Sequence, residues 1–218
     1  ANLLGLVPVI LISMFKDLLE DTKRHKEDAI ENNQRIQRVD TVSYGFTDDK
    51  WSNLRVGQLV KVNKNERFPA DLILVKSADP TGLAYVETVN LDGETNLKHK
   101  RAIRDIQEAI DSPSDAATLC GQIYCDTPNE HLYRFDGMAD VSLKGSEYRY
   151  RYRLDYDQLM LRGASLKITQ WVYGLVVFTG KETKIKQNDL KSMKTRKRSR
   201  MEIMMSWQIL IVVAIQML

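Results

Sequence analysis

The residues best suited to chemistry lie in one short run, Asp92-Gly93-Glu94-Thr95, which ends a strand-like stretch that begins at Ala84. The glycine predicts an exposed turn. Glycine also lets a backbone come close to a ligand, so a carboxylate beside it suits a loop that presses against a phosphorylated partner. The Asp-Gly pair is equally the commonest signal of a β-hairpin, so the run alone leaves open a simple turn with a solvated glutamate.

The other residues with chemical potential are dispersed along the chain. The two cysteines, Cys120 and Cys125, fit no disulfide framework, and the three histidines are too scattered to complete a four-ligand zinc site with them. We expect two reduced thiols in a cytosolic fold. Tyrosine alternates with arginine over residues 148–153, which would give a strand one aromatic and one cationic face. A half-buried hairpin with solvated arginines is favoured there over a surface for lipid headgroups or a partner.

Composition restricts the class of protein. The chain has 218 residues, of which 43% are hydrophobic and 28% charged, and its formal net charge is +3. This length suits one domain with short additions at its ends. The near-balanced charge does not indicate a nucleic-acid partner.

Two uncharged apolar runs, Leu3 to Phe15 and Ile203 to Leu218, lie near the ends of the chain. Each is shorter than the about 20 residues that span a bilayer as a helix, so we expect each to be part of a transmembrane helix. Basic residues follow the first run and precede the second. Lysine and arginine near spans stay on the cytoplasmic side, which predicts a multi-pass membrane protein with a cytosolic segment between the runs. Buried core helices of a soluble protein are the alternative.

The pattern of apolar residues changes several times between these runs. Helical spacing of apolar residues continues from Phe15 to Gln37, whereas short alternating runs broken by glycine and proline follow from Val42. The predicted parts are the end of a transmembrane helix (1–15), a stalk helix (16–40), a β-rich domain (41–180), a basic stalk or linker (181–202) and the start of a transmembrane helix (203–218).

Within the β-rich part, short alternating runs predict seven strands. Isoleucines on one helical face predict a helix over Ala102 to Ile110. The predicted strands are Gln58 to Asn63, Leu72 to Lys76, Ala84 to Leu91, His131 to Phe135, Tyr148 to Leu154, Gln158 to Ile168 and Trp171 to Phe178. The fold class is therefore mainly β.

Three segments flank the acidic run in a set order: Phe68 to Val75 before it, then Leu161-Arg162-Gly163 and Trp171 to Gly180 after it. With Asp92-Gly93-Glu94-Thr95 and the following Asn-Leu-Lys, this arrangement resembles the actuator domain of the P4-type ATPases, the phospholipid flippases. The resemblance implies a distorted jelly-roll-like actuator domain with helical stalks and parts of the second and third transmembrane helices.

The resemblance also implies roles for the acidic run. In a flippase, an aspartyl phosphate elsewhere in the enzyme is hydrolysed, and the attacking water needs a base within hydrogen-bond reach. Glu94 is the expected base. Gly93 allows the loop to approach the phosphate, and Asp92 and Thr95 are expected to support the loop through hydrogen bonds to its backbone.

Two flanking motifs are expected to be mainly architectural. Pro69 can open a core strand because a missing N–H is tolerated there, and Asp71 is expected to accept hydrogen bonds from a nearby loop backbone. Arg162 and Gly163 form the turn of the Leu-Arg-Gly motif. Arg162 is a weaker candidate for contact with the nucleotide-binding or phosphorylation domains.

For the parent protein, the resemblance implies a phospholipid-transporting enzyme that uses ATP and Mg²⁺ and moves lipid from the exoplasmic or lumenal leaflet to the cytosolic one. The expected partners are its phosphorylation, nucleotide-binding and transmembrane domains, a CDC50-type accessory subunit, the phospholipid and the membrane. This sequence lacks the family's phosphorylated Asp-Lys-Thr-Gly-Thr motif, so by itself it is not a complete catalyst.

Two other functions stay open on the sequence. A flippase-like region without transport could serve as a regulatory or scaffold module. The actuator of a cation-transporting P-type ATPase is disfavoured, because those relatives typically carry Thr-Gly-Glu-Ser at this loop. The sequence does not indicate which phospholipid or organelle is involved.

Overall fold

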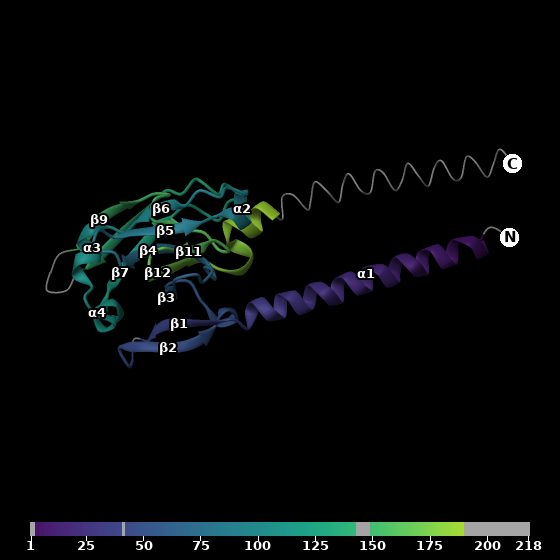
Figure 1. The fold of residues 1–218 in the computed structure, drawn as a ribbon, viewed down its shortest axis with the longest axis horizontal. Coiled ribbons are helices and arrows are strands. Elements are labelled where there is room, and N and C mark those ends of the chain that lie inside the picture. Colours follow the sequence, from purple (N-terminus) through teal and green to yellow (C-terminus); the bar gives the residue numbers. More distant parts are fainter. Residues whose placement is uncertain (1–2, 41, 143–148, 190–218) are drawn as a thin grey trace.

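A computed structural model describes residues 3–40, 42–142 and 149–189 of the chain. Within these ranges, the long helix α1 (Leu3–Asn32) projects from one end of a β-rich body (Figure 1). The mainly β fold class is thereby confirmed, with antiparallel sheets and short helices making up the body.

The largest sheet has six antiparallel strands in the order β10-β4-β12-β3-β1-β2. In chain order these are β1 (Arg35–Asp40), β2 (Gly45–Lys50), β3 (Leu59–Asn63), β4 (Asp71–Ser77), β10 (Leu159–Met160) and β12 (Trp171–Phe178). Strands β4 and β12 are central, and most of their residues are buried. Burial on both faces explains why their sequences are nearly continuous apolar runs.

Two smaller antiparallel sheets and several short helices complete the body. The first small sheet has the order β11-β5-β6, built from β5 (Leu83–Glu87), β6 (Lys98–Arg101) and β11 (Ser165–Lys167). The second has the order β7-β8-β9, built from β7 (Cys120–Cys125), β8 (Gly137–Ser142) and β9 (Arg149–Leu154). The short helices are η1 (Trp51–Asn53), α2 (Val89–Asp92), α3 (Arg104–Ala109), α4 (Pro113–Thr118) and η2 (Gly180–Glu182).

The small sheets form the two layers that cover the large one. Side chains alternate between the faces of a strand, and in β4 this places Leu72 and Leu74 in one core with Val86 of β5. Ile73 and Val75 lie in a second core with Val141 of β8 and residues of α3 and α4. An apolar cavity of about 480 Å³ lies in the second core, between the large sheet and β7, β8 and α4.

The first helix is shorter at its carboxyl end than predicted. It ends at Asn32, and residues 35–40, expected to continue the stalk helix, form strand β1. Asparagine favours helix ends because its side chain competes for backbone groups, and the Asn33 amide donates to the Ala29 carbonyl oxygen at 2.8 Å. Ile36 and Val39 are then buried in the sheet, so tertiary packing overrides the helical spacing.

Most of the predicted elements of the β-rich part are present. Strands β3, β4, β9 and β12 confirm four predicted ranges, and α3 confirms the helix predicted over Ala102 to Ile110. The range Gln158 to Ile168 contains two strands, β10 and β11, separated by the turn at Gly163, whose φ is +85°. In β9 the arginines lie in solvent while Leu154 is buried, as expected for a half-buried hairpin.

Two predicted strands are wrong in whole or in part. The strand expected over Ala84 to Leu91 ends at Glu87, where Thr88 begins helix α2. The range His131 to Phe135 forms no strand but a turn-rich segment fixed by side-chain contacts. Strands β2, β6, β7 and β8 and helix α4 lacked a clear apolar period and were not predicted, and β1 lies in the range predicted as helix.

The predicted membrane segments are only partly covered. The first apolar run forms the amino-terminal half of α1. No helix within the described ranges is both long enough and apolar enough to cross a membrane. The second apolar run and most of the basic stretch before it fall outside the described residues.

Candidate functional site

The acidic run forms a tight loop between β5 and β6, at the end of the body from which α1 projects (Figure 1). Helix α2 occupies a single turn, and Gly93 ends it with a left-handed backbone (φ +75°) while its N–H donates to the Val89 carbonyl oxygen. Leu91 packs against both hydrophobic cores. The loop is therefore anchored from below and turns outward at the glycine.

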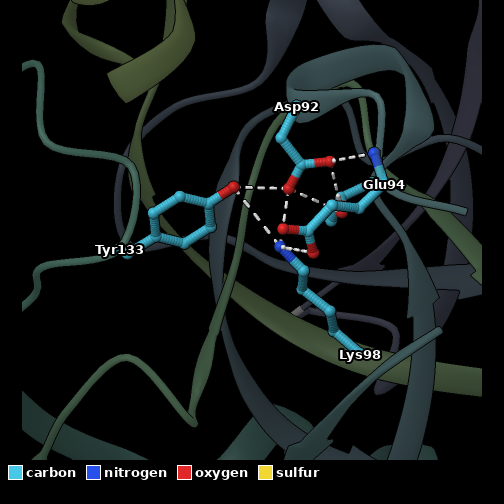
Figure 2. Close-up of polar contacts among 5 residues, drawn as sticks. Asp92, Glu94, Lys98 and Tyr133 are labelled. Carbon is cyan, nitrogen blue, oxygen red and sulfur yellow. Dashed lines mark hydrogen bonds and ion pairs between the residues drawn. The ribbon is translucent and has the colours of Figure 1, made fainter. Parts of the chain in front are cut away.

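Asp92 is the centre of the loop's polar network (Figure 2). Its carboxylate accepts hydrogen bonds from the Thr88 hydroxyl at 3.0 Å, the Glu94 backbone N–H at 2.9 Å and the Lys98 ammonium at 2.6 Å, and a further short one from the Tyr133 hydroxyl. Burial alone would raise the pKa of the Asp92 carboxyl, but these donors outweigh it and hold that pKa well below its usual range. Asp92 is therefore charged at neutral pH.

Lys98 joins the two acidic side chains of the loop. Its ammonium lies 2.6 Å from an Asp92 oxygen and 3.1 Å from a Glu94 oxygen (Figure 2). Burial alone would lower the pKa of Lys98, but the hydrogen bonds to both carboxylates outweigh burial and raise it. One cation is thus fixed between two anions, and their mutual repulsion is reduced.

The remaining loop residues point into solvent. The Glu94 side chain is 59% exposed, so its carboxylate can reach a group outside this chain while Lys98 holds it. A side chain at Gly93 would meet no atom within 4 Å, so the space in front of the glycine is open. Thr95 is exposed, and its side chain makes no hydrogen bond within the described part of the chain, so its expected support of the backbone stays a prediction.

Several known proteins similar in sequence to this chain carry the name of one activity. Phospholipid-transporting ATPase 1 of Arabidopsis thaliana is 38% identical over 211 residues, which are 97% of this chain and 17% of that protein. Phospholipid-transporting ATPase 6 of the same plant is 44% identical over 202 residues, 93% of this chain and 16% of that protein. The chain belongs to the P4-type phospholipid-transporting ATPases. The mouse relative FetA agrees, with 37% identity over 94% of this chain.

The chain spans about one sixth of the length of these P4-type relatives, from 16% to 17%. No protein-family model matches it. A solved zinc-transporting PIB-type ATPase in its E2.Pi state is 12% identical over 73% of this chain and 16% of that one, with a TM-score of 0.39, a likeness too distant to carry an argument.

In this P4-type region, sequence reasoning missed three of the side chains that fix the loop. Lys98 was recognised only as part of the motif, and Thr88 was placed inside a strand. Tyr133 lies 41 residues from Asp92, in the segment between β7 and β8. Neither periodicity nor turn chemistry signals a contact between two side chains so far apart in the chain.

Asp71 fulfils its expected structural role at the start of β4. It is fully buried, and its carboxylate accepts hydrogen bonds from the backbone N–H groups of Arg162 and Lys184, each at 2.8 Å. Burial raises the pKa of Asp71 to about 6. The carboxylate ties the Leu-Arg-Gly turn to the chain that leaves β12.

Arg162 connects the body to the first helix. Its guanidinium lies 2.9 Å from the Glu31 carboxylate at the end of α1 and donates to the Gly180 carbonyl oxygen at 3.3 Å. Only 12% of the Arg162 side chain is exposed, so most of it is used inside the chain. The expected contact of Arg162 with other domains stays a prediction.

A second lysine of β6 lies below the loop in a different environment. Lys100 is 2% exposed, and its ammonium donates to the Tyr156 carbonyl oxygen at 2.7 Å and lies over the Tyr156 ring. Burial lowers the pKa of Lys100 to about 7. Within the described ranges no group of three or more histidine, cysteine, aspartate or glutamate side chains is placed to hold a metal ion.

Proposed function

We propose that this chain is the actuator region of an ATP-driven phospholipid flippase, and that Glu94 promotes hydrolysis of the aspartyl phosphate of the complete enzyme. One observation carries the proposal: an exposed carboxylate stands on a loop fixed by a partly buried hydrogen-bond network centred on Asp92. Such a carboxylate can dock against a group on another domain without losing its own position. Rigid placement of a base relative to its substrate is what general base catalysis requires.

The loop also provides a way to bring a carboxylate close to a phosphate. Two anions repel each other, and Lys98 offsets part of this repulsion because its ammonium stays 3.1 Å from the Glu94 carboxylate. The open space at Gly93 lets the backbone approach the acyl phosphate. Glu94 then takes a proton from the attacking water, the new P–O bond forms, and the bond between phosphorus and the aspartyl oxygen breaks.

The wider assignment concerns the complete protein. The names of the relatives support a phospholipid cargo over a cation. We propose that the complete enzyme binds ATP and Mg²⁺, carries lipid towards the cytosolic leaflet and associates with a CDC50-type subunit. The segment described here would then be cytosolic, with a jelly-roll-like actuator fold, and α1 and the chain beyond β12 would connect it to membrane helices.

The test is phosphoenzyme decay in the complete ATPase that contains this chain. Membranes with wild type, Glu94→Gln or Glu108→Gln receive a pulse of labelled ATP, and the acid-stable label is followed after lipid is added. Glu108 is the matched control, because it is an exposed glutamate of α3 that also pairs with a cation. We expect Glu94→Gln to slow decay by about 100-fold or more and Glu108→Gln to decay like wild type.

Two results would contradict the proposal. Decay of Glu94→Gln at the wild-type rate would show that Glu94 is not the base. Absence of any phosphoenzyme in wild type would favour a regulatory or scaffold module without transport.

A further inference from the structure

The segment between β7 and β8 reaches across the body to the acidic loop. This segment, residues 126–136, has no strand or helix of its own. Its Tyr133 donates a short hydrogen bond to Asp92, and the Lys98 ammonium lies 3.3 Å from the same hydroxyl and 4.4 Å from the ring centre (Figure 2). Tyr133 therefore contacts both members of the ion pair that orients Glu94.

The ring of Tyr133 contributes little to the hydrophobic core. The residue is 50% exposed, and its ring packs edge-on against Tyr156 at a centroid distance of 5.6 Å. Removing the hydroxyl alone would leave this ring contact in place. The hydroxyl is thus the part of Tyr133 that contacts Asp92, while the ring faces the Lys98 ammonium.

A fully buried lysine fixes the segment that carries Tyr133. Lys184 is 0% exposed, and its ammonium donates to the Asn129 side-chain oxygen at 2.7 Å and to the His131 carbonyl oxygen at 3.0 Å. The backbone N–H of Lys184 donates to Asp71. Lys184 stands just beyond β12, where the chain leaves the body, so one residue links that exit to the segment above the loop.

We propose that Tyr133 is a positioning residue for the acidic loop, and that Lys184 holds it in place. The Tyr133 hydroxyl orients the Asp92–Lys98 pair, and that pair orients Glu94. Tyr133 touches neither the phosphate nor the water, so it acts through other residues. The inference rests on the proposed function, because it concerns the same loop.

The first experiment compares Tyr133→Phe with wild type and with Tyr124→Phe in the complete ATPase. Tyr124 is a matched control: it is 55% exposed on β7, and its hydroxyl donates a hydrogen bond to the Gln122 side chain. We expect Tyr133→Phe to slow lipid-stimulated decay of the phosphoenzyme about 10-fold and Tyr124→Phe to leave it unchanged. Transfer of the phosphoryl group back to ADP needs no attacking water, so Tyr133→Phe should not change that rate, whereas a general structural defect would.

A double-mutant cycle tests the route through Asp92. In an Asp92→Ala background, Tyr133→Phe should slow decay less than 2-fold, because the acceptor of its hydroxyl is already absent. Equal slowing in both backgrounds would overturn the proposed route.

Lys184→Met and Asn129→Ala test the anchor from its two sides. Each is expected to slow decay about 3-fold or more while ADP-dependent transfer stays normal. If Lys184→Met does not fold, Asn129→Ala alone tests the anchor. Wild-type decay in Asn129→Ala would overturn the anchoring. If Glu94→Gln traps the phosphoenzyme but Tyr133→Phe decays like wild type, this inference fails while the proposed function stands. If Glu94→Gln also decays like wild type, the proposed function itself fails.

Discussion

The acidic loop and the interior of this molecule shift the pKa values of their charged side chains in opposite directions. In the acidic loop, Asp92 and Lys98 meet each other, and the pKa of the acid is lowered while that of the lysine is raised. In the interior beneath, Asp71 and Lys100 are buried, and their pKa values shift towards neutrality, to about 6 and about 7. Pairing keeps the loop charged, whereas burial weakens the charge of the interior groups.

The difference follows from the partners of each group. Asp71 receives two backbone N–H donors, which are neutral, and these do not outweigh full burial. Asp92 receives a full cation and several neutral donors at the edge of the body. The interior carboxylate of Asp71 is suited to holding chain segments together. The loop carboxylate of Asp92 is suited to staying charged beside Glu94.

The largest expected effect is the loss of the buried carboxylate. Asp71→Ala leaves the N–H groups of Arg162 and Lys184 without an acceptor, at a cost of about 4 kcal/mol in the free energy of local unfolding. Asp92→Ala should cost less than half as much, because water can replace its exposed contacts. Hydrogen exchange of the β4 and β12 amides in the complete ATPase measures both. Equal protection of these amides from exchange in the two variants would show that the buried and the loop carboxylate contribute equally to stability.

The pH dependence of stability should also separate the two aspartates. Asp71 has a pKa of about 6 in the folded chain against 3.8 unfolded, so the folded state binds its proton more tightly. Its contribution to stability therefore falls by about 3 kcal/mol as pH rises from about 4 to 6. The lowered pKa of Asp92 gives the opposite sign: its contribution is present above pH 3.8 and is lost as pH falls through the folded pKa.

Urea unfolding of the chain, followed by tryptophan fluorescence at several pH values, measures how the free energy of unfolding changes between pH 4 and 6. The Asp71→Asn variant is the control, because it cannot titrate there. A wild-type slope between pH 4 and 6 that matches Asp71→Asn would show that Asp71 is not the group responsible.

The buried lysine offers a stabilising substitution. In Lys100→Met the side chain keeps its approximate length and loses a charge that burial disfavours, so we expect a gain of about 2 kcal/mol at pH 7. Because the folded pKa of Lys100 lies below the unfolded value, wild-type stability should rise as pH increases above 7, and this rise should be absent from the variant. The urea midpoints of the two chains at pH 7 and 9 test both points. Destabilisation at pH 7 would mean that the bond to Tyr156 outweighs the burial of charge.

The smallest expected effect concerns the backbone of the acidic loop at Gly93. Gly93→Ala places a side chain at φ +75° in open space, so it adds strain of about 1 kcal/mol and no clash. Gly57→Ala is the matched control, with φ +87° and equally open surroundings away from the loop. Both should lower stability alike, but only Gly93→Ala should slow phosphoenzyme decay. Equal decay in the two variants would show that the loop tolerates a shift of its backbone.

Sequence reasoning recovered the parts of this structure that repeat a local pattern. The central strands β4 and β12 were predictable because burial on both faces leaves unbroken apolar runs. Ile36 was assigned to a helix because its spacing fitted, but its partners in the sheet decide its conformation. The Tyr133 contact could not be predicted, because a bond between side chains 41 residues apart depends on the completed fold.

The attachment of α1 has a mechanical consequence. A helix of 30 residues is about 45 Å long, and its end at the body is held by the ion pair between Glu31 and Arg162. If the helix moves as a rigid rod, a tilt of about 10° at that end displaces the far end by about 8 Å, given a rise of about 1.5 Å per residue. A small change of angle where one guanidinium holds the helix would thereby move its far end by more than the about 5.4 Å pitch of a helical turn.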